Sequence, residues 1–170
     1  VDQLAALPDI KRVVVVGDGI ESLHYYLALL GKEVIYVDMN ETHVENVTLF
    51  WDRYVKAAGN EGLAYSKDDI KCINSEIGAL DLGQHGIEAG SCDLVTLIDL
   101  GCGAVGNTRE WFETAKRLLR PDGYMITDYT DTWGTSLGQL ASIRFAMFTN
   151  APWGVQTKPI SEVFRSVFPD

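Results

Sequence analysis

The sequence predicts an α/β fold, a single domain over residues 1–170 with a mostly parallel sheet and helices on both faces. Strand-like and helix-like segments alternate along the chain, which is typical of parallel strands joined by helices. Residues 13–16 are four consecutive valines, and such runs favour a strand buried on both faces. No repeat, and no linker rich in Pro, Gly and Ser, divides the chain.

The first half of the chain is expected to hold two strands, each followed by a helix. The valine strand leads into a helix over residues 21–31, which Gly31 ends. Its expected buried face holds Leu23, Tyr26, Leu27 and Leu30. After a second strand at 34–37, Asn40 caps a longer helix that Gly59 closes. The inner face of that helix should carry Val44, Val47, Trp51 and Val55.

The second half continues the alternation. Residues 70–74 and 94–100 are expected to be the third and fourth strands. Asn107 and Glu110 have the spacing of a capping box, and the helix they open should bury Trp111, Ala115, Leu118 and Leu119. A turn at 121–123 leads to a fifth strand at 124–127. Further helices are expected at 136–148 and after Ser161.

Composition excludes several classes of function. A net charge of −10 disfavours nucleic acid as the main partner, since phosphate backbones attract cationic surfaces. No apolar run is long enough for a membrane span, and no secretory signal is visible. Cys72, Cys92 and Cys102 lack metal-ligand or redox spacing, so we expect a reduced, cytoplasmic protein without a metal site.

A glycine turn follows the first strand and indicates a bound cofactor. Gly17, Asp18 and Gly19 open the first helix, where glycine lets the backbone approach a ligand closely. Asp38 ends the second strand, about twenty residues on, where a carboxylate can accept from ribose hydroxyls. Strand, Gly-x-Gly, helix, strand and acid in this order predict a site for an adenine-nucleotide-like cofactor.

Two families share parts of this pattern. The segment VVVVGDGIESLHYYLALLGKEVIYVD resembles the N-terminal unit of FAD- and NAD-binding oxidoreductases. The segments VIYVDMNETHVENVTLFWDRYVKAAGNEG, SCDLVTLIDL and LLRPDGYMI resemble class I S-adenosylmethionine-dependent methyltransferases, over about residues 11–130. That second resemblance implies a Rossmann-like fold with strand order 3-2-1-4-5 and S-adenosylmethionine as cofactor.

The resemblance also implies roles for individual residues. Gly17, Asp18 and Gly19 would lie beside the methionine moiety and sugar, and Asp38 would bind the ribose hydroxyls. Met39, Glu76 and Ile77 would surround the adenine, with Glu76 accepting from its amino group. Asp99 and Leu100 would face the methyl group and the substrate. Candidate general bases follow the fourth and fifth strands: Asp99, Asp128 and Asp131.

The sequence also departs from the methyltransferase pattern. Val15 stands where that family has an acid, Glu21 where it has a third glycine, and the edge hairpin is not recognisable before the chain ends. An open sheet edge suggests an oligomer or a partner subunit that covers it. A second glycine-rich stretch, 97–103, is interpreted as a loop at the same edge of the sheet.

Three functions are therefore considered. The first is S-adenosylmethionine-dependent methyl transfer to a small molecule. The second is a non-catalytic, methyltransferase-like subunit that binds a partner chain. The third is a nicotinamide- or flavin-binding oxidoreductase domain, which only the N-terminal segment favours.

Overall fold

The structure, a computed structural model, describes residues 10–17, 22–97, 108–127 and 165–168. Its centre is a five-stranded, all-parallel sheet in the order β3-β2-β1-β4-β5, as predicted. The strands are β1 (Arg12–Val16), β2 (Glu33–Asp38), β3 (Ile70–Asn74), β4 (Cys92–Leu97) and β5 (Leu119–Thr127). The helices are α2 (Leu23–Leu29), α3 (Glu41–Asn60) and α4 (Thr108–Leu118), with 3₁₀ turns η1 (Lys67–Asp69) and η2 (Ile77–Ala79).

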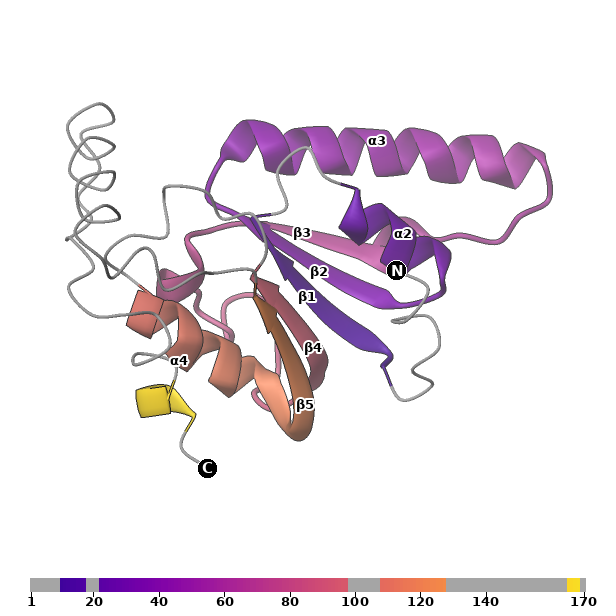
Figure 1. Ribbon diagram of the computed structural model, residues 1–170. Helices are drawn as coiled ribbons and strands as arrows, with labels where there is room; N and C mark the ends of the chain where they lie inside the picture. Colours follow the sequence, from indigo (N-terminus) through magenta and orange to yellow (C-terminus); the bar gives the residue numbers. More distant parts are fainter. Residues whose placement is uncertain (1–9, 18–21, 98–107, 128–164, 169–170) are drawn as a thin grey trace.

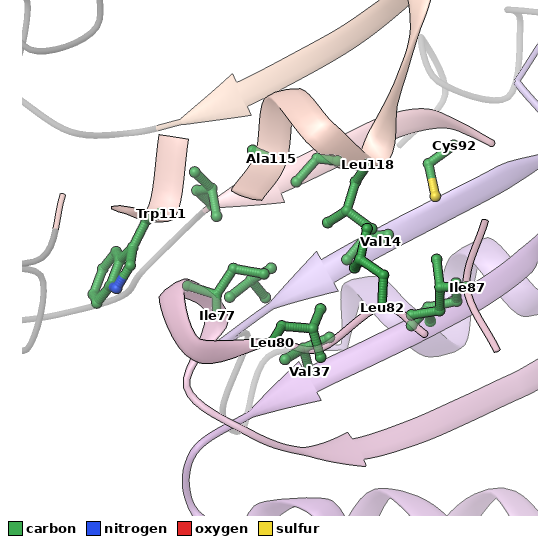
Figure 2. Packing of buried hydrophobic residues seen from close by; sticks show 14 of the residues in the cluster. Val14, Val37, Ile77, Leu80, Leu82, Ile87, Cys92, Trp111, Ala115 and Leu118 are labelled. Atoms are coloured by element: carbon green, nitrogen blue, oxygen red, sulfur yellow. The ribbon is translucent and has the colours of Figure 1, made fainter. Parts of the chain in front are cut away.

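The alternating side chains of β1 divide the interior into two cores. Val13 and Val15 face α2 and α3, and their cluster includes Leu27, Tyr36 and Trp51. Val14 and Val16 face the opposite side, where η2 and α4 pack. Figure 1 shows α2 and α3 on one side of the sheet and α4 on the other. Figure 2 shows the second core, in which Val14 lies between Leu118 and Leu80, and Val37 lies beside Leu80.

Asp93, near the N-terminal end of β4, connects this strand to the N-terminal ends of β1 and β5. Its Oδ2 accepts hydrogen bonds from the backbone N–H groups of Lys11 and Arg12, at 2.7 and 2.8 Å. Its Oδ1 lies 3.0 Å from Nε of Arg120 on β5. Although burial alone would raise the pKa of the Asp93 carboxyl, the two backbone donors and the Arg120 charge lower it. One buried carboxylate therefore links β1, β4 and β5.

The face that α2 buries differs from the prediction. Leu27 is buried as expected, but Tyr26 and Leu30 are exposed, while His24 and Ala28 are buried instead. The His24 ring lies 4.7 Å from that of Tyr36, so an aromatic contact on the sheet orients the helix. The prediction rested on the helical spacing of leucine and tyrosine residues, and this spacing contains no information about the burial of His24.

Three predicted ends of helices and strands also shift. Gly59 lies inside α3 with no atom within 4 Å of an added Cβ, and the left-handed residue after the helix is Gly62, at φ +79°. Leu119 begins β5 rather than ending α4, and β4 begins at Cys92. Residues 98–100, Asn107 and 136–148 lie outside the described residues, and of the helix expected after Ser161 the described residues 165–167 are helical, with Val167 buried.

The predicted turn at 121–123 is a bulge within β5. Cys92 pairs with Leu119 and Leu94 pairs with Tyr124. Between these two pairs β5 therefore advances five residues while β4 advances two. The bulge brings Gly123 against its neighbours: an added Cβ would lie 2.9 Å from Leu119 Cδ2 and 3.1 Å from the carbonyl oxygens of Arg120 and Cys92. Two of these atoms are backbone, so the space is closed to any side chain.

Gly123→Ala should destabilise the protein by about 1–3 kcal/mol, because the added methyl group overlaps atoms that cannot move freely. Gly59→Ala is the matched control, since its site is open and exposed on α3. That substitution should stabilise the protein by roughly 0.5–1 kcal/mol through helix propensity. Urea unfolding measures both. Equal effects of the two substitutions would contradict the close packing at Gly123.

Asp93→Asn should cost about 1–3 kcal/mol at neutral pH, because the amide weakens the bonds to both backbone donors and loses the ion pair. Because the folded-state pKa of Asp93 is lowered, its contribution is complete above the unfolded-state pKa of about 3.9. The contribution is lost as the pH falls through the folded-state value. Denaturant unfolding of both proteins between pH 7 and pH 3 should show the difference narrowing only in acid.

Candidate functional site at the carboxyl ends of the strands

Gly17 occupies the point where β1 leaves the sheet. Its φ is +66°, a left-handed conformation that glycine adopts without strain. Its N–H donates to the carbonyl oxygen of Val37 at 2.9 Å, which continues the pairing of β1 with β2 by one residue. The chain therefore turns sharply within one residue of the end of β1. Asp18 and Gly19, the other predicted residues of this turn, lie outside the described residues.

Asp38 ends β2 and holds the entrance to α3. Its Oδ2 accepts from the Tyr36 hydroxyl at 2.8 Å and lies 3.1 Å from Nδ1 of His43. Its Oδ1 accepts from the Asn40 N–H at 2.8 Å, and the Asn40 side chain in turn accepts from the N–H of Thr42 as the α3 cap. Since a carboxylate only accepts, His43 Nδ1 must carry its proton when Asp38 is ionised.

The burial of Asp38 limits what it can still bind. The residue is 6% exposed, and three donors already surround its carboxylate. Two of those donors share Oδ2, so Oδ1 keeps one unused lone pair. The backbone carbonyl of Asp38 also accepts, from the N–H of Ser75 at 3.0 Å and from Asn74 Nδ2 at 3.1 Å. Asp38 is thus a structural centre as well as a candidate ligand residue.

Glu76 follows β3 and caps η2. Its Oε2 accepts from the N–H of Ala79 at 2.8 Å. Its Oε1 is buried and has no hydrogen-bond partner within the described residues. A buried acceptor without a donor costs free energy, so this oxygen is suited to a ligand N–H. Ile77, the next residue, is 3% exposed and belongs to the core beneath α4.

Gly78 and Trp111 complete this corner of the sheet edge and were missed by sequence reasoning. A Cβ on Gly78 would lie 3.0 Å from Glu76 Oε2 and 3.1 Å from Trp111 Cδ1, so the carboxylate and the indole both pack against the glycine backbone. Figure 2 shows the Trp111 ring beside the turn that carries Ile77. The indole Nε1 is buried and also lacks a partner in the described part of the chain. The sequence predicted Trp111 only as a core residue.

The remaining predicted residues are placed as follows. Met39 comes directly after Asp38 and is 53% exposed. Val15, where the family pattern has an acid, is buried among apolar side chains of the α2 and α3 core. The candidate bases Asp99, Asp128 and Asp131, as well as Leu100 and Glu21, lie outside the described residues. Within the ranges that the structure describes, no three His, Cys, Asp or Glu side chains gather as metal ligands.

Comparison with known proteins identifies the fold. No family model and no curated protein matches the sequence. Among solved structures, the CcbJ methyltransferase from Streptomyces caelestis matches with a TM-score of 0.54 and 22% identity, over 79% of this chain and 49% of that one. A TehB-like SAM-dependent methyltransferase from Corynebacterium glutamicum matches with a TM-score of 0.53 and 15% identity, over 84% and 68%.

The glycopeptide N-methyltransferase MtfA, solved in complex with S-adenosylmethionine, matches with a TM-score of 0.55 and 14% identity, over 78% of this chain and 54% of that one. The chain spans about half the length of CcbJ and MtfA. At these identities the similarity establishes the fold alone: the chain shares its Rossmann-like, parallel-sheet fold with these methyltransferases.

Asp38→Asn tests how much the hydrogen bonds of the Asp38 carboxylate contribute to the stability of the protein. The amide nitrogen cannot accept a hydrogen bond, so either the Tyr36 and His43 donors or the Asn40 N–H lose their acceptor. We expect a loss of about 1–3 kcal/mol in the free energy of unfolding. Asp52→Asn, which breaks the exposed ion pair with Lys67, should cost under about 1 kcal/mol. A similar loss of unfolding free energy in the two variants would show that the hydrogen bonds of Asp38 contribute no more to stability than an exposed ion pair.

Proposed function

We propose that this chain binds S-adenosylmethionine at the carboxyl edge of its sheet and promotes methyl transfer to a small molecule. The observation that carries the proposal is the row of acceptors and turns along one sheet edge. Gly17, Asp38 and Glu76 follow β1, β2 and β3, which are neighbours in the sheet. Ligands of open α/β sheets bind in the crevice at this edge.

The residues at this edge fit the adenosine half of the cofactor. The unused lone pair on Asp38 Oδ1 can accept from one ribose hydroxyl. The unpartnered Oε1 of Glu76 can accept from the exocyclic amino group of adenine. Met39 exposes an apolar side chain next to Asp38, where a flat ring needs a contact. The left-handed Gly17 removes a Cβ from the path of the ligand.

In the proposed reaction the chain contributes chiefly by positioning. When bound, S-adenosylmethionine supplies a methyl group on a positively charged sulfur. Holding the acceptor in line with that methyl group removes much of the entropic barrier. Asp99 and Asp128 are proposed as general bases for an acceptor that carries a proton. The strands that precede them end at Leu97 and Thr127, which are partners in the β4–β5 register.

The same proposal includes a small-molecule acceptor and a cytoplasmic setting. The net charge of −10 disfavours a nucleic-acid substrate. No helix in the described part of the chain is long and apolar enough to cross a membrane. Cys72 and Cys92 form no disulfide, which suits a reducing compartment, and burial raises the pKa of both thiols, which makes them less reactive.

A second candidate function is a non-catalytic subunit with the same fold. It is favoured by the commitment of the Asp38 carboxylate to three internal donors and by the buried Val15. Within the described strands, β5 ends the sheet order, and a partner chain could pair with it. This alternative expects a stable complex with another chain and no turnover by the isolated protein.

Calorimetry with S-adenosylhomocysteine tests the proposed cofactor site, and Glu76→Gln is the informative variant. The Gln carbonyl keeps the cap on the Ala79 N–H, while the amide nitrogen now faces the adenine amino group as a second donor. We expect affinity to fall about tenfold with the stability unchanged.

Asp81→Asn is the matched control for Glu76→Gln, because Asp81 also accepts from a backbone N–H, that of Gln84, in a nearby loop. That variant should bind the ligand like the wild-type protein. Absence of binding by the wild-type protein at millimolar ligand would refute the proposed function. Equal weakening by both variants would refute the part assigned to Glu76.

A further inference from the structure

Exposed apolar side chains gather on α2 and α3, away from the proposed cofactor edge. The large exposed hydrophobic residues of these two helices and their ends are Tyr26, Leu30, Leu49, Phe50, Tyr54 and Leu63. Tyr26 and Phe50 are the most exposed of them, at 52% and 57%. The rotation of α2 that buries His24 is what turns Tyr26 outward. A concentration of this kind on one face marks an interaction site.

A pocket of about 540 Å³ lies within this surface, between α2 and α3. Its lining is mainly aromatic: Ser22, Tyr25, Tyr26, Leu29, Phe50, Trp51, Arg53 and Tyr54. The volume falls in the range of small-molecule sites, which are lined by apolar side chains with a few polar groups. Phe50 lies nine residues beyond the start of α3, roughly 13 Å along the helix, so the aromatic part of the pocket lies away from Asp38, while Ser22 at the N-terminus of α2 marks its end nearest the glycine turn.

Stacked rings suit this pocket to a flat ligand. The Trp51 indole lies 5.4 Å from the Tyr54 ring at an interplanar angle of 13°, and 6.3 Å from the Tyr25 ring at 24°. The indole is held from behind, because its Nε1 donates to the carbonyl oxygen of Ser66 at 2.9 Å. Trp51 itself is buried, at 2% exposed, so its contact holds the exposed Tyr54 ring in a fixed orientation against which a planar ligand can pack.

The positive charge of Arg53 favours a negatively charged ligand in this pocket. Among the described residues of the lining, Arg53 is the one that carries a charge. Among the described residues, no carboxylate pairs with its guanidinium, and the residues four positions away on α3 are Leu49 and Ala57. In a chain with a net charge of −10, an arginine kept beside stacked aromatic rings matches a carboxylate, which it can hold with two donors. Ser22 adds a hydroxyl that makes no cap bond to α2.

We propose that the pocket between α2 and α3 binds a small aromatic acid, its ring against the exposed rings of Tyr26, Phe50 and Tyr54 and its carboxylate on Arg53. This site is distinct from the cofactor edge, and it does not depend on methyl transfer. Binding there would cover the apolar surface that the two helices expose. The ligand is identified by its chemistry: a planar ring of one or two cycles with a single negative charge.

The test uses two probes with the same bicyclic ring and opposite charge, 2-naphthoate and 2-naphthylmethylamine, in calorimetric titrations of the full chain. We expect 2-naphthoate to bind and the amine to bind at least fivefold more weakly. Arg53→Gln should weaken 2-naphthoate about fivefold and leave the amine unchanged or tighter, since an exposed charge pair contributes about that much. Phe50→Ser should weaken both probes.

Lys56→Gln is the control, because it removes the same charge from the same helix outside the pocket lining. It should leave both affinities unchanged, and circular dichroism of these surface variants should match the wild-type spectrum. Equal affinity for the two probes, no binding of either at millimolar concentration, or equal effects of Lys56→Gln and Arg53→Gln would overturn the proposal. A dimer in sedimentation that Phe50→Ser dissociates would also overturn it, since a second copy would then fill the pocket. S-adenosylhomocysteine binding should be unaffected by Arg53→Gln, which separates this site from the cofactor edge.

Discussion

The burial of β1 on both faces is the constraint on which the rest of the structure depends. Its four valines are fully enclosed, with β2 and β4 bonded along either side. Because successive residues point to opposite faces, the strand requires an apolar layer above and another below. The α2 and α3 layer supplies one, and η2 with α4 supplies the other. The Gly17 turn and the Asp38 carboxylate owe their positions to the ends of β1 and its neighbour β2.

Much of this fold could be predicted because its signals are local. The valine run, the Asn40 cap and the strand at 70–74 are each encoded within a few residues, and the structure confirms them. What could not be predicted depends on distant contacts. His24 is buried because the Tyr36 ring lies beneath it, and Leu119 joins the sheet because Cys92 pairs with it. Neither partner is visible in the sequence around these residues.

In the candidate site, too, the locally encoded features could be predicted and those that depend on distant contacts could not. The positions of Gly17 and Asp38 followed from strand ends and spacing, but the bonds of Asp38 did not. Tyr36 and His43 reach it from two and five residues away, a pattern without a recognised motif. Gly78 and Trp111 meet across 33 positions of sequence, and only the packing of α4 against η2 reveals them. The roles of Asp18, Gly19, Asp99 and Asp128 stay predictions.

A consequence of these bonds is that stability and binding are linked at the end of β2. The carboxylate that we propose as a ribose ligand also closes the β2–α3 connection, so a substitution of Asp38 would change stability together with any binding. Glu76 is less constrained, since one of its oxygens caps η2 and the other is left without a partner. We therefore expect substitutions of Glu76 to change chiefly the affinity for the cofactor, and substitutions of Asp38 to change chiefly the stability of the fold.

A crystal structure of the protein with S-adenosylhomocysteine would locate the cofactor site directly. We expect adenosine density at the carboxyl edge of the sheet, with a ribose hydroxyl on Asp38 Oδ1 and the adenine amino group on Glu76 Oε1. Density at another place, or an empty edge at saturating ligand, would contradict the proposed site.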